Sequence, residues 1–182
     1  MATTHTIQDI YEKKVLSHLK EQFSIENRFA APKILKVVVN CGVGRVKDDK
    51  QLTDIVKQIS LITGQKPLPC PAKKAIASFK SREGLVIGYK VTLRGKRMYD
   101  FLNKLVSTAI PRTRDFRGIN LSAVDHAGNL SLGIKEHIIF PETIGEDVRS
   151  IFGLEVTVVT NAKSKERGVE LFRSLGFPLV KE

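Results

Sequence analysis

Hydrophobic residues recur along this chain at two spacings, and each spacing predicts a different kind of element. Apolar positions three or four residues apart, separated by Lys and Glu, are typical of amphipathic helices. The predicted helices are residues 7–23, a segment capped by Asp48 or Asp49 and ended by Gly64, residues 96–109 closed by Pro111, a short helix near 142–151, and a last helix that starts at a Ser164 cap.

Short β-branched runs predict strands. The predicted strands are residues 33–40, about 75–80, 86–94 and 154–160, and residues 119–134 are predicted to form a hairpin with its turn at 125–129. Prolines at 67, 69 and 71 predict a loop before the second strand. This order of elements favours an α+β fold, in which a mostly antiparallel β-sheet has helices packed on one face and leaves the other face open.

Alternation within two of these strands assigns each residue to one face, since successive side chains of a strand point to opposite sides. The apolar face receives Leu35, Val37, Val39, Val91 and Leu93. The other face receives Lys36, Val38, Asn40, Lys90, Thr92 and Arg94. The cations of this set can neutralise phosphates, and its amide and hydroxyl groups can bond to sugars and base edges. The set contains no carboxylate. We therefore expect an open basic face that binds a nucleic acid.

The charge of the chain is concentrated in one quarter of its length. The net charge is +11, of which residues 1–71 contribute +4, residues 72–118 contribute +9, and residues 119–182 contribute −2. A solvated surface normally mixes both signs, so this segregation indicates a polyanionic partner. The chain has no Trp and no aromatic RNA-recognition motif, which favours contacts to the backbone and shape of a folded RNA. A DNA-binding regulator is less favoured, because the cations lie mostly on strands and loops.

The residues that usually carry catalysis or metal binding are scattered. The four histidines lack metal-ligand spacing; His126 falls in the predicted hairpin turn and His137 in a strand, both as surface or structural residues. Cys41 and Cys70 are expected to be reduced and half-buried. No apolar run is long enough to span a membrane. We therefore expect no enzyme, no cofactor, no metal and no membrane partner.

One alternative is a nucleotide-dependent enzyme built on the turn Gly42-Val43-Gly44. A strand, a Gly-x-Gly and a helix also begin the dinucleotide-binding fold. However, Lys47 stands where that fingerprint needs its third glycine. The structural interpretation is that Gly42 and Gly44 permit a tight turn with positive φ.

Four blocks of sequence carry a resemblance to a known family. They are residues 59–80, 82–102, 110–118 and 133–142, beginning with ISLITGQKPLPCPAKK, REGLVIGYKVTLRGKRM, IPRTRDFRG and GIKEHIIFPE. In this order they resemble ribosomal protein L five of the bacterial large subunit, and the similarity extends over nearly the whole chain. The resemblance implies one RNA-binding domain over residues 1–182, with a non-enzymatic role in the cytoplasmic ribosome. Its implied partner is 5S rRNA, which it anchors in the central protuberance.

The resemblance also implies roles for particular residues. The positions that match the family's 5S rRNA contacts are Lys36, Asn40, Gln65, Phe79 and Thr92, to which alternation adds Lys90 and Arg94. A mobile basic loop at about 73–85 matches the family's contact with P-site tRNA, with Lys73, Lys74, Lys80 and Arg82 as its cations. Candidates for a bridge to protein S thirteen of the small-subunit head are Arg112, Arg114, Arg117 and Lys135. Further implied partners are 23S rRNA and other proteins of the central protuberance.

Overall fold

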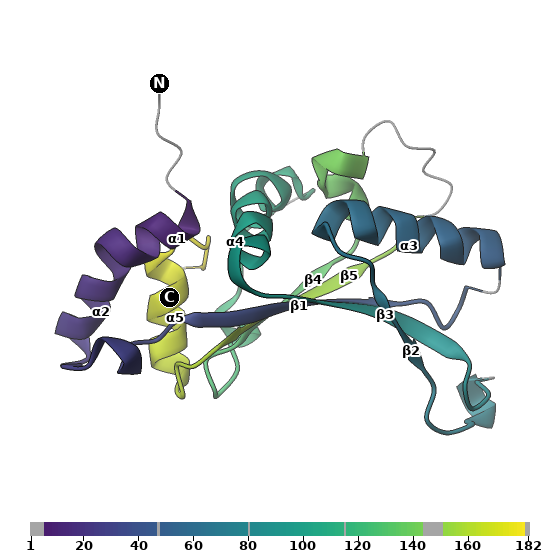
Figure 1. Cartoon of the computed structure of the whole chain (residues 1–182), viewed down its shortest axis with the longest axis horizontal. Coiled ribbons are helices and arrows are strands. Elements are labelled where there is room, and N and C mark those ends of the chain that lie inside the picture. The colour runs from purple at the N-terminus through teal and green to yellow at the C-terminus, as the bar shows by residue number, and fades with distance from the viewer. Residues whose placement is uncertain (1–5, 47, 80, 115, 144–150, 181–182) are drawn as a thin grey trace.

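A five-stranded antiparallel sheet organises the molecule, as a computed structural model shows (Figure 1). The structure describes residues 6–46, 48–79, 81–114, 116–143 and 151–180. The strands are β1 (Ile34–Gly42), β2 (Leu68–Pro71), β3 (Val86–Leu93), β4 (Leu130–Ile134) and β5 (Leu154–Thr160). Their order across the sheet is β2-β3-β1-β5-β4, and each neighbouring pair is antiparallel.

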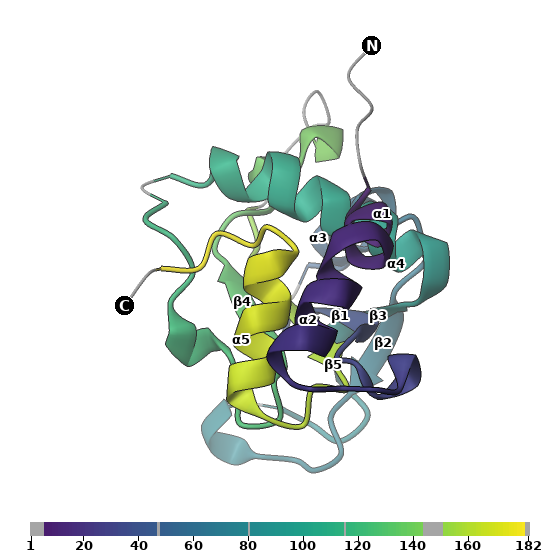
Figure 2. The same cartoon turned by 90° about the vertical axis from the view of Figure 1, so that its left-hand side faces the viewer.

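Helices cover one face of this sheet. The helical segments are α1 (Ile7–Ile10), the π-helical η1 (Tyr11–Val15), α2 (Leu16–Gln22), α3 (Asp49–Thr63), α4 (Gly95–Lys104), the π-helical η4 (Leu105–Ala109) and α5 (Lys165–Ser174). In Figure 1, α3 and α4 lie above the sheet, and none of the described helices lies beneath its middle, where β1, β3 and β5 are labelled. Figure 2 shows α2 and α5 side by side at one end, where His18 and Glu170 are 3.2 Å apart. The predicted α+β class is confirmed.

The core lies between the covered face and the helices. Strand side chains that are almost fully buried include Val37, Val39, Val91, Leu93, Val156 and Val158. Capping matches the sequence: Asp48 accepts a hydrogen bond from Lys50 N–H at the start of α3, and Gly64 ends α3 with φ of 66°. Ser164 caps α5 by accepting from Arg167 N–H, as expected.

Two neighbouring segments exchange their predicted roles. Residues 68–71, expected as loop, form the edge strand β2. Successive N–H groups of an antiparallel strand point to opposite edges, so prolines two residues apart remove donors from one edge only. Residues 75–79 do not form the strand predicted over about 75–80, because Ile76 and Ser81 exchange backbone hydrogen bonds and the chain reverses through a 3₁₀ turn at Ala77–Phe79.

The predicted hairpin over 119–134 is correct in its turn and in its second strand, which is β4, but not in its first strand. Asp125 and Asn129 close that turn through backbone and side-chain hydrogen bonds. Before it, Leu121–Ala123 form a 3₁₀ turn, and Val124 makes a single bridge to Leu130. β4 instead pairs with β5 along its length, because β5 offers five consecutive partners.

Two further expectations change, and a third falls mostly outside the described residues. His137 begins a buried 3₁₀ turn rather than lying in a strand. The helix expected near 142–151 falls mostly on residues 144–150, which lie outside the described residues; Pro141–Thr143 form a 3₁₀ turn. Leu35 is exposed rather than in the core, because a register shift between Ile34 and Lys36 reverses the alternation and Ile34 takes the buried position. Within the described part of the chain, no helix is long and apolar enough to cross a membrane.

Candidate nucleic-acid interface

The uncovered sheet face is built from aligned rows of side chains. Strand partners in register share a face, so the pairings place residues across the sheet. One row runs Leu68, Lys90, Asn40, Glu155 and Gly133, from β2 to β4. The next row runs Thr92, Val38, Thr157 and Ser131, and the hydroxyls of Thr157 and Ser131 are 3.3 Å apart. A third row pairs Lys36 with Val159. The sheet therefore brings the predicted Lys36, Asn40, Lys90 and Thr92 together on one face.

The cations of this face occupy its centre and one end. Lys90 is exposed next to Asn40, and Lys36 is half-buried opposite Val159. Arg94 lies just beyond β3 at the N-cap of α4, where it is exposed and its side chain makes no capping hydrogen bond. The first turn of α4 carries no acid, so its positive dipole end adds to these charges. This end of the face is suited to phosphate groups.

A carboxylate lies in the same row, contrary to the expectation that the face has none. Glu155 is exposed on β5, opposite Asn40 on one side and Gly133 on the other. Alternation within residues 154–160, a strand that the sequence did predict, would have found Glu155 and Thr157. That β5 lies next to β1 is decided only by long-range pairing.

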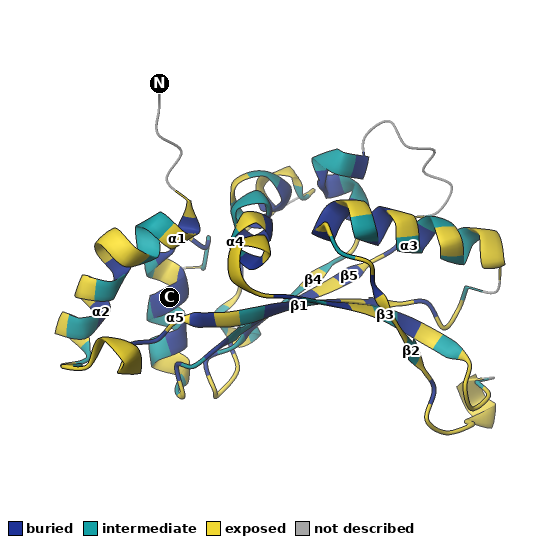
Figure 3. Ribbon diagram, viewed as in Figure 1, coloured by how far each residue is buried: buried dark blue, intermediate teal, exposed yellow. Residues whose placement is uncertain are grey.

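Two predicted contact residues lie off the sheet face. Gln65 is half-buried in the connection that leads from the end of α3 to β2, and its carbonyl accepts a hydrogen bond from the Thr63 hydroxyl. Phe79 belongs to the 3₁₀ turn at the tip of the β2–β3 connection, where it is 78% exposed. Figure 3 shows this tip as an exposed end that projects away from the helices. A ligand that contacts both the sheet face and Phe79 must therefore extend from that face to this tip.

The basic loop at 73–85 forms an arm at the end of β2 and β3. Ala72 and residues 84–85 close its base through two backbone hydrogen bonds, and Ile76 pairs with Ser81 further out. Lys73, Lys74 and Arg82 are exposed. Lys80 lies outside the described residues. The arm holds its described cations away from the core, where a second ligand can reach them.

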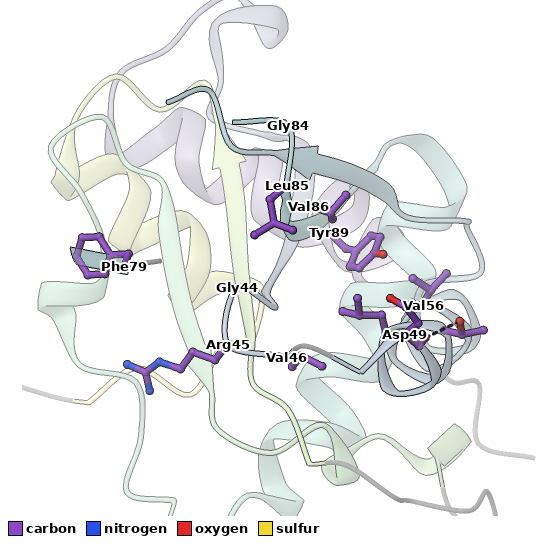
Figure 4. A pocket seen from close by; sticks show the side chains of 12 residues that line it. Gly44, Arg45, Val46, Asp49, Val56, Phe79, Gly84, Leu85, Val86 and Tyr89 are labelled. Atoms are coloured by element: carbon purple, nitrogen blue, oxygen red, sulfur yellow. Dashed lines mark hydrogen bonds between the residues drawn. The ribbon is translucent and has the colours of Figure 1, made fainter. Parts of the chain in front are cut away.

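An open groove of about 950 Å³ separates this arm from the start of α3 (Figure 4). Its lining is mostly apolar and includes Phe79, Leu85 and Tyr89, with Arg45 pointing away from α3. The expected tight turn forms, since Val46 N–H donates to the Val43 carbonyl at 2.9 Å, but neither Gly42 nor Gly44 has the expected positive φ. The described strands are antiparallel, whereas the dinucleotide fold needs parallel strands. The groove therefore does not support the nucleotide-enzyme alternative.

The four candidate bridge residues separate into two groups. Arg114 and Lys135 line one small cavity of about 420 Å³ with Glu136 and Ile139. Arg112, at the end of a 3₁₀ turn, and Arg117, in the following loop, are exposed but do not line that cavity.

Burial shifts the pKa of two core residues, Cys41 and His137. Burial raises the pKa of the Cys41 thiol to about 11, and Cys41 and Cys70 are both free. Cys41 is fully buried rather than half-buried. His137 is fully buried with its ring stacked 4.0 Å from that of Phe152, and burial lowers its pKa. No group of three or more His, Cys, Asp or Glu suited to a metal occurs among the described residues.

Models of one protein family match both halves of the chain. A family model described as "Ribosomal protein L5" matches residues 27–82, and a second model, described as the C-terminus of the same ribosomal protein family, matches residues 86–179. Strands from the two matched regions alternate in one sheet, since β1 lies between β3 and β5.

Several relatives align over nearly the full length of the chain. Proteins called "Large ribosomal subunit protein uL5" from Halothermothrix orenii, Syntrophomonas wolfei and Malacoplasma penetrans are 48%, 49% and 44% identical to it. These alignments cover 92%, 94% and 100% of this chain and 94%, 97% and 97% of the relatives. The family consists of non-enzymatic, RNA-binding proteins of the cytoplasmic ribosome. The chain therefore belongs to the L5 family of large-subunit ribosomal proteins, as its sequence blocks had indicated.

Proposed function

We propose that this protein anchors 5S rRNA in the central protuberance of the large ribosomal subunit, with residues 1–182 acting as one RNA-binding domain. The observation that supports this most strongly is the uncovered sheet face, on which Lys36, Asn40, Lys90 and Thr92 converge without a covering helix. A rigid sheet holds these groups in place before binding, so little ordering entropy is lost when the RNA docks. The RNA then serves as the missing layer over the sheet.

Binding by this face is electrostatic at its cationic end and polar at its centre. Lys36, Lys90 and Arg94 neutralise phosphates. On a duplex, each neutralised phosphate makes the slope of the logarithm of the binding constant against the logarithm of the salt concentration more negative by about 0.9. Asn40 and Thr92 offer an amide and a hydroxyl for sugar and base edges. Gln65 and Phe79 extend the contact surface from the sheet to the arm.

The test is the salt dependence of 5S rRNA binding by single-cation variants. Lys36→Ala and Arg94→Ala are expected to weaken binding and to flatten the salt slope by about one unit each. Lys14→Ala is the matched control, because Lys14 is exposed on the helical layer, away from the sheet face. If both face variants bind like the control, the assigned face is wrong.

A second contact uses the arm. We infer that Lys73, Lys74, Lys80 and Arg82 touch P-site tRNA, which the projection of the arm from the helices supports. Neutralising these four positions together should weaken tRNA contact in reassembled ribosomes and leave 5S rRNA binding largely intact. An equal loss of both interactions would show that face and arm are one site.

The remaining proposed partners are 23S rRNA, neighbouring proteins of the central protuberance and protein S thirteen of the small-subunit head. For the last, Arg114 and Lys135 are the best-placed candidates because they line one cavity, with exposed Arg112 and Arg117 in the same chain segment as Arg114. Arg114→Glu with Lys135→Glu should weaken subunit association at low magnesium. Unchanged association would remove this pair from the bridge.

A further inference from the structure

Glu155 is a feature of the sheet face that charge neutralisation of an RNA does not explain. It is exposed in the central row of the face, directly opposite Asn40, whose other neighbour is Lys90. A phosphate beside this carboxylate would be repelled, even though phosphates provide most of the attraction between a basic face and RNA. The group facing Glu155 must therefore be something other than a phosphate.

The three central side chains are available for a ligand. Glu155, Asn40 and Lys90 make no side-chain hydrogen bond or ion pair with any described residue of the protein. Their side chains thus present an acceptor, an amide and a cation in one line across β5, β1 and β3. Carboxylates and amides bind base edges, whereas lysine alone suffices for a phosphate.

The surface next to Glu155 is also low enough for a base to approach. Gly133, its partner on β4, has an ordinary backbone conformation, and a Cβ added there would meet nothing within 4 Å. The same holds for Gly42, two residues beyond Asn40 on β1. Neither packing nor backbone strain in the protein explains these two strand glycines, and strand glycines often mark a site where a ligand comes close.

We propose that Glu155 reads an unpaired guanine of the bound RNA, accepting hydrogen bonds from its N1–H and N2–H groups, with Asn40 bonding alongside. This inference rests on the proposed RNA-binding role of the face and adds a base-specific contact to it. Guanine is the base whose Watson–Crick edge carries two adjacent N–H donors, which match the two oxygens of one carboxylate. Exposed Watson–Crick edges occur in the single-stranded loops and bulges of RNA. Glu155 therefore serves specificity rather than charge neutralisation.

Replacing Glu155 by glutamine, its neutral isostere, tests whether the carboxylate binds a guanine or only repels phosphates. The two cases change the affinity for 5S rRNA in opposite directions. Glu155→Gln is expected to weaken binding of 5S rRNA about tenfold, because the amide has one acceptor oxygen instead of two and its NH₂ faces a donor. If Glu155 only repels phosphates, the same variant would tighten binding, by up to about fivefold. Glu21→Gln, an equal charge change at an exposed position on α2, controls for net charge. Thermal unfolding of each variant verifies that the fold is intact.

Chemical footprinting supplies the second readout. A glyoxal reagent that modifies N1 and N2 of unpaired guanine should find one guanine protected by the wild-type protein and by Glu21→Gln, but reactive in the Glu155→Gln complex. Tighter or unchanged binding by Glu155→Gln, or an identical footprint, overturns the assignment of Glu155 alone. If Lys36→Ala and Arg94→Ala also leave binding unchanged, the RNA role of the face fails, and the inference fails with it.

Discussion

The contact between Gly168 of α5 and Gly128 of the 125–129 turn makes a sharp prediction about stability. A Cβ added at Gly168 would lie 2.5 Å from the Cα and 2.7 Å from the carbonyl oxygen of Gly128. Carbon atoms pack best at about 3.5–4.0 Å, and backbone atoms cannot rotate out of the way. Gly168→Ala must therefore push the turn and the helix apart.

The energetic balance has two opposing parts. Alanine is favoured over glycine inside a helix by about 1 kcal/mol. Overpacking costs about 1–3 kcal/mol. Displacing the turn also weakens two hydrogen bonds to Thr160, which donates from its hydroxyl to the Gly128 carbonyl at 2.8 Å and from its N–H to Asn129 Oδ1 at 2.9 Å, each worth about 1 kcal/mol. The costs of overpacking and of the weakened hydrogen bonds exceed the gain in helix propensity, and we expect a net destabilisation of about 3 kcal/mol.

Thermal and urea unfolding of Gly168→Ala measure this effect. A loss of about 3 kcal/mol corresponds to a fall in Tm of about 6–12 °C for a chain of this size. Gly133→Ala is the control, since its new Cβ meets nothing within 4 Å and its stability should stay within about 0.5 kcal/mol of wild type. A Gly168→Ala protein as stable as wild type would refute the steric argument, because the helix-propensity gain would then have prevailed.

Three further predictions concern titratable groups. Burial lowers the pKa of His137 in the folded protein. The fold is therefore most stable above the pKa of this histidine in the unfolded chain, and its stability falls as pH drops below about 6.5. His137→Gln should flatten the dependence of Tm on pH between pH 5 and 7. Burial raises the Cys41 pKa to about 11, so iodoacetamide at pH 7.5 should label Cys70 alone in the native protein and both thiols after denaturation, as read by intact mass. Slight burial raises the pKa of Asp125, but hydrogen bonds from Asn129 and from neighbouring N–H groups lower it overall. The ionised carboxylate therefore stabilises the fold above the unfolded pKa, and this stabilisation is lost as pH falls below about 4. The Tm profile of Asp125→Asn should lack this loss.

Local patterns determined which residues share a face. Alternation placed Lys36, Asn40, Lys90 and Thr92 on one side, and the registers of β1 against β3 and β5 confirm that placement. The reason is that the two-residue period of a strand is a property of the extended backbone and holds wherever the strand is regular; it fails at Leu35, where β1 bulges against β5. The caps of α3 and α5 were equally readable, because a cap involves only residues within one turn.

The pairing of strands far apart in the chain decided the order of strands in the sheet and the contacts between them. Alternation within one strand could not show that Glu155 would stand opposite Asn40, because that contact exists only once β5 pairs with β1. Nor could it show that the proline-containing segment 68–71 would pair with β3 and so carry the arm away from the helices, since edge strands depend on a partner's free backbone groups. The sequence by itself determined which residues of β1 and of β3 lie on the uncovered face. The tertiary structure decided that Glu155 joins them and that the contact surface extends to the arm, because strand pairing forms between segments far apart in the chain.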